Sequence, residues 1–117
     1  MAEKRNIDRH RKRYPLRFGS GDLARTAFTE DISTTGLFVR TAHVCNPGSL
    51  VKVELTLENE QQVILEARVV WVKRVPPQMI RLARKGGMGL RIVRFVSGED
   101  VYRLLCEELS LPYAELL

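Results

Sequence analysis

Hydrophobic and polar residues alternate along much of this chain with the period of two that is typical of half-buried β-strands. The clearest case is residues 51–57, where four apolar side chains alternate with Lys52, Glu54 and Thr56. A second alternating segment, residues 63–71, has one wholly apolar face. These two segments predict a pair of long strands that bury one face each.

Shorter alternating or apolar segments predict four further strands, at residues 16–18, 23–33, 37–41 and 88–95. Glycine, proline, asparagine and aspartate gather between them, and these residues favour tight turns. Short strands separated by turns are typical of a small antiparallel barrel.

The pattern changes to a helical period near the end of the chain. Val101, Leu104, Leu105 and Leu109 recur at intervals of three and four residues, which gives one apolar stripe. Pro112 ends this helix because proline cannot continue it. The predicted fold class is therefore mainly β: a small six-stranded antiparallel β-barrel with a C-terminal amphipathic helix.

Charge divides the chain unevenly. Residues 1–17 carry seven basic and two acidic side chains, a net charge of +5 that equals the formal charge of the whole protein. The first of these residues contain few apolar side chains to bury, so we predict a basic mobile arm at residues 1–13, a barrel with its helix at residues 14–111, and a tail at residues 112–117. A basic arm calls for an anionic partner, which leaves nucleotides, nucleic acids, acidic proteins and membrane surfaces open.

Several function classes find no support in the sequence. The chain has no nucleophile elbow, no paired histidine and carboxylate and no phosphate-binding Walker loop, so we do not expect an enzyme. Its two cysteines and two histidines lack the spacing of a metal site, and we expect neither a metal nor a cofactor. No apolar run approaches the length of about 18 residues that a membrane span needs, and we expect a cytoplasmic protein.

Polar residues with a distinctive spacing surround the end of the predicted strand at residues 23–33. Because alternate side chains of a strand share a face, we expect Asp31 and Ser33 to stand side by side on the open face, opposite Phe28 and Ile32. Gly36 follows where the chain turns, and glycine permits a positive φ or the close approach of a ligand. The sequence therefore predicts a loop that can admit a planar ligand.

These residues resemble a known family signature. An Arg-x-x-x-Arg near the amino terminus followed by Asp-x-Ser-x-x-Gly is similar to the paired motif of the PilZ domain, which Arg9, Arg13, Asp31, Ser33 and Gly36 match. The resemblance covers nearly the whole chain, because the segments at residues 69–72 and 87–90 also resemble later strands of that domain.

The first motif occurs in three overlapping registers, which are Arg5/Arg9, Arg9/Arg13 and Arg13/Arg17. The segment Tyr14-Pro15-Leu16 and the distance to the second motif favour the middle register.

The resemblance implies a non-catalytic receptor for cyclic di-GMP, a bacterial second messenger with two guanines and two phosphates. Arginine forks match the O6 and N7 acceptors of guanine and the phosphates, which suits Arg9 and Arg13. A carboxylate and a hydroxyl accept from the N1 and N2 donors, which suits Asp31 and Ser33. Closure of the arm over this ligand is then expected to change the surface shown to a downstream protein partner.

Other interpretations stay open. The basic arm is also typical of a nonspecific nucleic-acid or polyanion binder, although an aromatic content of 7% disfavours single-stranded nucleic acid. A PilZ-like adaptor that binds no nucleotide is a further alternative. Arg40 and Trp71 are additional ligand-binding candidates, but Arg40 is equally suited to surface solvation, and Trp71 shares its parity with Val63 and Val69, which favours core packing.

Overall fold

The alternating segments form strands of one antiparallel sheet in the computed structural model, which describes residues 9–75 and 86–110. The elements are, in chain order, β1 (His10–Arg11), β2 (Pro15–Gly19), β3 (Arg25–Ile32), β4 (Gly36–Arg40), β5 (Leu50–Thr56), a 3-10 turn η1 (Glu58–Glu60), β6 (Gln62–Lys73), β7 (Gly87–Ser97) and the helix α2 (Glu99–Leu109).

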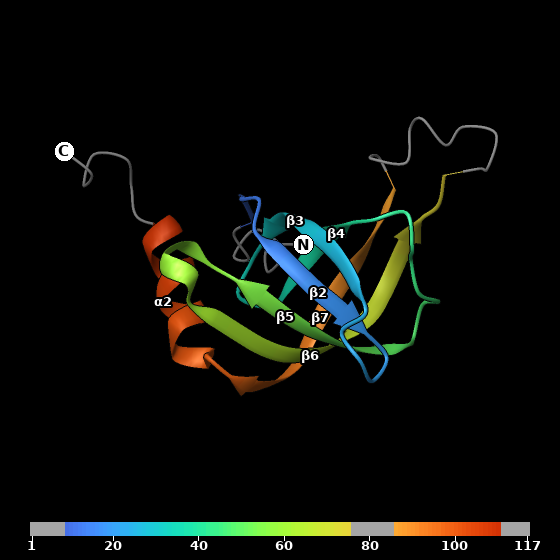
Figure 1. Ribbon diagram of the computed structural model, residues 1–117. Helices are drawn as coiled ribbons and strands as arrows, with labels where there is room; N and C mark the ends of the chain where they lie inside the picture. Colours follow the sequence, from blue (N-terminus) through green and yellow to red (C-terminus); the bar gives the residue numbers. More distant parts are fainter. Residues whose placement is uncertain (1–8, 76–85, 111–117) are drawn as a thin grey trace.

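Six of these strands close into a barrel. The strand order β3-β2-β5-β6-β7-β4 returns to its start because β4 also pairs with β3 (Figure 1). The two-residue strand β1 pairs with the end of β3, His10 opposite Ile32 and Arg11 opposite Asp31. The prediction of a six-stranded antiparallel barrel with one C-terminal helix is thus confirmed, with β1 as a short addition.

The barrel interior is filled by the apolar faces that the alternation predicts. Val53 and Leu55 of β5, Leu65 of β6 and Phe18 of β2 are fully buried. Each such side chain contributes about 1.5 to 3 kcal/mol through burial, so the interior dominates the stability of the fold.

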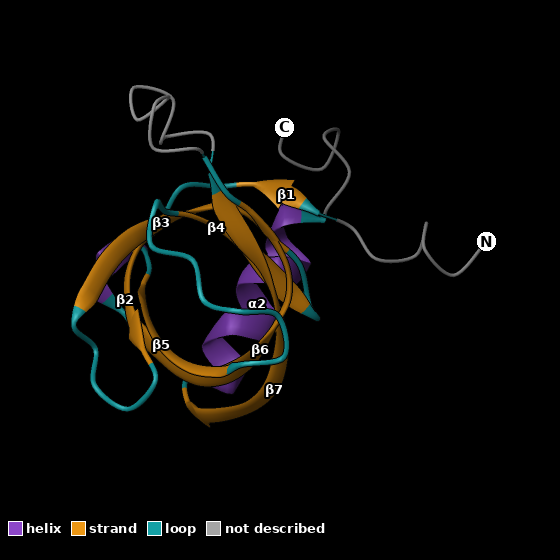
Figure 2. Ribbon diagram, turned by 90° about the vertical axis from the view of Figure 1, so that its right-hand side faces the viewer, coloured by secondary structure: helices purple, strands orange, loops and turns teal. Residues whose placement is uncertain are grey.

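Both open ends of the barrel are covered. Figures 1 and 2 show α2 lying across one end, while the segment between β4 and β5 crosses the other. Val44 and Cys45 of that segment pack against the core. The helix begins after Gly98, whose φ of 84° is a conformation that glycine adopts without strain.

The helix packs most of the predicted stripe against the barrel, because Val101, Leu105 and Leu109 contact the core. Tyr102 and Cys106 are buried, whereas Leu104 of the predicted stripe is 55% exposed. Successive helical residues point about 100° apart, so the buried centre of the helix lies to one side of the predicted stripe.

A bulge changes the direction of side chains near the end of β6. In the pairing with β7, Val69 lies opposite Leu90 and Trp71 opposite Gly89, so the register shifts between them. Beyond this shift Trp71 is 48% exposed. The preference for Trp71 as a core residue is therefore wrong, because one extra residue moves the following side chains to the other face.

Residues 9–13 lie against the barrel. The hydroxyl of Thr29 accepts a hydrogen bond from the Tyr14 backbone N–H at 2.8 Å and donates to the Lys12 carbonyl at 2.6 Å. The expected mobility of the arm at residues 1–13 stays a prediction, and residues 1–8 lie outside the described part of the chain.

Candidate functional site

The end of β3 does not follow the simple alternation predicted for it. Its register against β4 shifts between Thr29 and Asp31. Phe28 is consequently 42% exposed while Ile32 is fully buried, and Ser33 is buried as well. The prediction that Asp31 and Ser33 share an open face is wrong, because β3 ends at Ile32 and Ser33 is buried in the turn that follows. The bulge explains the other difference, that Phe28 is exposed and Ile32 is buried.

Ser33 instead shapes the turn between β3 and β4. Its Oγ accepts hydrogen bonds from the backbone N–H groups of Thr35 at 3.3 Å and Gly36 at 3.2 Å. Its own N–H donates to the Gly36 carbonyl at 2.8 Å. The hydroxyl therefore holds the backbone of the turn, and any part it has in ligand binding acts through that backbone.

Gly36 is needed for the close approach of two strands. A Cβ at this position would lie 2.2 Å from the carbonyl oxygen of Leu90 on β7. The expected alternative of a positive φ is not observed at this glycine. Any larger residue would push β4 away from β7 at the edge of the turn.

Arg9 and Asp31 meet beside this turn. The Arg9 Nη1 donates to the Asp31 carboxylate at 2.5 Å, and both side chains are partly exposed. An ion pair of this exposure contributes at most about 1 kcal/mol, so its members can exchange this contact for a ligand at little cost.

An aromatic pair lies beside β7, with Phe38 buried and Trp71 half-exposed. The rings of Trp71 and Phe38 stack with centroids 5.0 Å apart and an interplanar angle of 11°. Glycines of β7 lie against both rings: a Cβ at Gly89 would be 2.3 Å from the Trp71 Nε1, and one at Gly87 would be 2.6 Å from the Phe38 Cζ. The two glycines therefore allow the rings to lie flat on the sheet.

These features border one cavity of about 290 Å³. Its lining combines two guanidinium groups, an exposed indole and the backbone of the turn, and comprises Arg9, Thr35, Gly36, Val70, Trp71, Gly89, Leu90 and Arg91. Such a lining can stack a planar base and attract an anion, since guanidinium groups pair with both base edges and phosphates.

Arg13 and Arg17 of the overlapping motif lie away from the cavity, and Arg5 lies outside the described residues. The Arg13 guanidinium is 4.5 Å from the centroid of Phe28 and is absent from the cavity lining. Arg17 pairs with Glu54 through its Nε and Nη2 atoms at 2.9 and 2.7 Å. Arg9 is thus the arginine of this motif that reaches the cavity, which disfavours the Arg13/Arg17 register.

Arg40 is also occupied outside the cavity. It pairs with Glu30 at 3.1 Å and its guanidinium lies 5.2 Å from the Phe38 ring centroid. Arg40 is not among the residues that line the cavity. Its role as a ligand contact stays a prediction.

The sequence analysis missed the part of the cavity that β7 supplies. Arg91 lies directly opposite Gly36 in the pairing of β4 with β7. Gly36 marks a position where another strand passes close by, but the sequence does not show which strand that is. Arg91 could therefore not be assigned to the cavity from the sequence.

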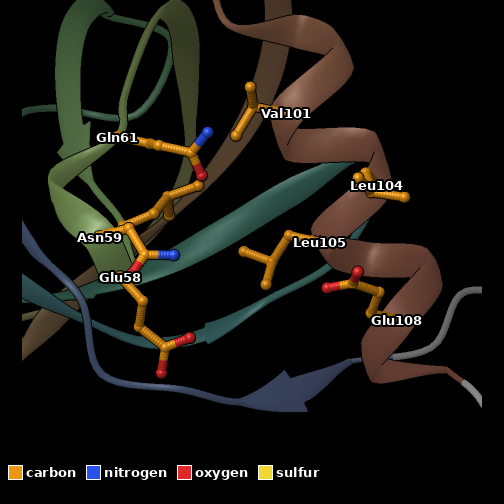
Figure 3. A pocket seen from close by; sticks show the side chains of 8 residues that line it. Glu58, Asn59, Gln61, Val101, Leu104, Leu105 and Glu108 are labelled. Atoms are coloured by element: carbon orange, nitrogen blue, oxygen red, sulfur yellow. The ribbon is translucent and has the colours of Figure 1, made fainter.

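A second cavity, of about 240 Å³, lies between α2 and η1 (Figure 3). Its lining includes the carboxylates of Glu58 and Glu108 together with Leu104 and Leu105, and contains neither arginine nor lysine. Carboxylates repel an anionic ligand, so this cavity is poorly suited to a phosphate-bearing molecule.

The helix is bonded directly to the turn of the candidate site. The hydroxyl of Tyr102 donates to the Ser33 carbonyl at 2.6 Å and lies 3.5 Å from the Gly36 carbonyl. Burial raises the pKa of Tyr102, so this hydroxyl stays protonated as a donor at ordinary pH. A second link joins His10 Nε2 to the Ser110 hydroxyl at 3.1 Å.

Within residues 9–75 and 86–110, histidine, cysteine and acidic side chains form no cluster suited to a metal ion. In the same part of the chain, no helix has the length and apolar character needed to cross a membrane.

Comparisons with known proteins agree with the architecture. A family model described as the PilZ domain matches residues 3–108. The inhibitor of motility MotI/DgrA of Bacillus subtilis is similar in structure, with 18% identity, a TM-score of 0.70, and coverage of 87% of this chain and 49% of that one. The PilZ domain of CeSA from a cellulose-synthesizing bacterium has 19% identity and a TM-score of 0.59 over 89% of this chain and 99% of that chain.

This chain therefore spans about half the length of the first of these structures, and both likenesses concern the fold. No curated protein matches.

Proposed function

The chain belongs to the PilZ domain family, and on that premise we propose that it is a non-catalytic receptor for cyclic di-GMP. The observation that carries the proposal is the meeting of Arg9 with Asp31 beside the cavity that Trp71 and the turn at residues 33–36 border. Both motif residues come from distant parts of the chain, and their contact beside the cavity supports the proposal.

Each group at the cavity suits one part of a guanine nucleotide. The Arg9 fork pairs with the O6 and N7 acceptors of a guanine or with a phosphate. The Asp31 carboxylate accepts from the N1 and N2 donors once the ligand takes the place of Arg9. Trp71 offers an exposed ring for stacking, a contact worth about 1 to 3 kcal/mol per base.

Arg13 requires a local movement to join this site. Its guanidinium leaves Phe28, where an exposed cation–π contact contributes about 0.5 to 1 kcal/mol, and turns toward the ligand. Charge-assisted hydrogen bonds return about 1.5 to 3 kcal/mol each, so the exchange is favourable. Four to six such bonds with base stacking offset the ordering of the arm and leave the roughly 8 kcal/mol of a micromolar complex.

We further propose that α2 transmits ligand binding to a downstream protein. Tyr102 joins the helix to the carbonyl of Ser33, and Ser110 joins it to His10 next to Arg9. A ligand that draws Arg9 inward and fixes the turn acts on both contacts, which changes the surface of the helix end of the barrel.

Calorimetric titration with cyclic di-GMP, GTP and cyclic GMP tests the receptor proposal. We expect binding of cyclic di-GMP alone, and loss of most of it in Arg9→Ala and in Asp31→Ala. Arg9→Lys is also expected to be damaging, because lysine lacks the planar fork. Arg17→Ala is the matched control, since Arg17 is engaged by Glu54 away from the cavity.

Unchanged affinity in Arg9→Ala would contradict the proposed site. A nonspecific polyanion binder is the second candidate, favoured by the net charge of +5 in residues 1–17. It predicts binding without nucleotide preference, a steep salt dependence, and equal losses in Arg9→Ala and Arg17→Ala.

A further inference from the structure

Arg91 is the second guanidinium of the cavity, and it belongs to neither signature motif. It lies on β7, opposite Gly36 of β4 on one side and opposite Arg68 of β6 on the other. Arg91 lines the same cavity as Arg9 and Trp71. A strand of the barrel, and not the arm, therefore supplies this cation.

The charge of Arg91 has no compensating carboxylate among the described residues. Arg9, the other arginine of the cavity, does have one, since it contacts Asp31. The cavity lining itself contains no acidic residue. Since Asp31 neutralises Arg9, Arg91 gives the cavity its excess positive charge.

The cross-strand neighbour of Arg91 strengthens this charge. Directly opposed residues of antiparallel strands have Cβ atoms about 4.5 to 5.5 Å apart, and like charges at that distance repel. Arg68 donates its Nη1 to the Gly48 carbonyl at 2.9 Å, which leaves its charge uncompensated. Opposed like charges are unfavourable, so an anion bound at Arg91 would offset the repulsion between these two arginines.

We propose that Arg91 binds a phosphate of the dinucleotide and is a determinant of affinity that the signature motifs do not contain. The inference rests on the proposed function and adds a residue to its site. Arg9 and Asp31 suit a guanine, while Arg91 neutralises the negative charge of the phosphate that links the two nucleosides. Because Arg91 is held by β7, it is in place before the ligand arrives and needs no ordering of the arm.

Calorimetry with cyclic di-GMP on Arg91→Ala, Arg91→Lys and Arg94→Ala tests this assignment. Loss of one charge-assisted hydrogen bond predicts roughly 10- to 150-fold weaker binding in Arg91→Ala. Arg91→Lys should recover part of the loss, because an ammonium still attracts a phosphate as a point charge. Arg94 lies on the same strand, is exposed and pairs with Glu66, so Arg94→Ala should bind as the wild type does.

Two further readouts separate a ligand contact from a structural role. Binding by Arg91→Ala should depend less steeply on salt, since one phosphate contact is gone. Without ligand, this variant should unfold at the same temperature as the wild type or higher, because the repulsion with Arg68 is removed.

These experiments separate failure of the Arg91 assignment from failure of the proposed receptor function. If the wild type binds and Arg91→Ala binds equally well with the same salt dependence, the inference is overturned and the receptor proposal stands. Complete loss in Arg91→Lys would overturn the phosphate assignment and place the guanidinium on a guanine edge. A wild type that does not bind cyclic di-GMP overturns the proposed function and this inference together.

Discussion

Replacing Tyr102 by phenylalanine removes a single oxygen from the contact between α2 and the turn of the candidate site. The ring of Tyr102 is fully buried and lies 5.6 Å from that of Phe95, centroid to centroid. Phenylalanine keeps the ring and its packing, so the variant isolates the hydrogen bond to the Ser33 carbonyl.

The expected loss of stability follows from the hydrogen bond that the Ser33 carbonyl loses. Among the described residues the Tyr102 hydroxyl is the hydrogen-bond donor to the Ser33 oxygen, whereas the Gly36 carbonyl keeps the Ser33 N–H at 2.8 Å. Leaving a buried acceptor without its partner costs about 1 to 3 kcal/mol. We therefore expect Tyr102→Phe to lower the free energy of unfolding by that amount.

Denaturant unfolding monitored by circular dichroism measures this change, with the slope against denaturant concentration expected to stay the same. Tyr14→Phe is the matched control. The Tyr14 hydroxyl is the buried side-chain polar atom that has no hydrogen-bond partner among the described residues. Its removal should be neutral or slightly stabilising, because a buried polar group without a partner is itself unfavourable.

Equal stabilities of the two variants would refute the reasoning, since the same chemical change was made at a bonded and at an unbonded hydroxyl. A large loss in Tyr14→Phe would refute it as well. If Tyr102→Phe alone is destabilised, the same variant can then be used to ask whether ligand binding still protects the amides of α2 from exchange.

Two further predictions concern the aromatic pair and alkaline pH. Gly89→Ala places a Cβ 2.3 Å from the Trp71 Nε1, so we expect the sole tryptophan to leave Phe38, its fluorescence to change and ligand binding to weaken. Gly21→Ala, where nothing lies within 4 Å of the added atom, should leave both measurements unaltered. Burial raises the pKa of Cys106 and of Tyr102, so the unfolded chain releases these protons at lower pH than the folded one. Stability should therefore be complete below the unfolded pKa values of about 8.5 and 10 and fall as the pH rises above them. Denaturant titrations between neutral pH and pH 10.5 check this, and a stability that rises over the range would contradict it.

The sequence by itself determined the strands of the barrel and the helix. The strict alternation at residues 51–57 predicts β5, and Pro112 predicts the end of α2 near residue 110, both as observed. The resemblance to the PilZ motif also selected Arg9 and Asp31, two residues that the fold brings into contact. These features depend on local periodicity and on fixed spacing, which a sequence displays directly.

Tertiary structure alone decided which way the side chains of the site point. The end of β3 at Ile32 left Ser33 in the turn, a bulge in β6 moved Trp71 to the surface, and the end of the barrel selected Tyr102 and Cys106 as the buried side chains of α2. Strand pairing alone placed Arg91 across from Gly36. A bulge depends on how two strands far apart in sequence align their hydrogen bonds. The alternation of residues along one strand does not show which strand pairs with it or in which register.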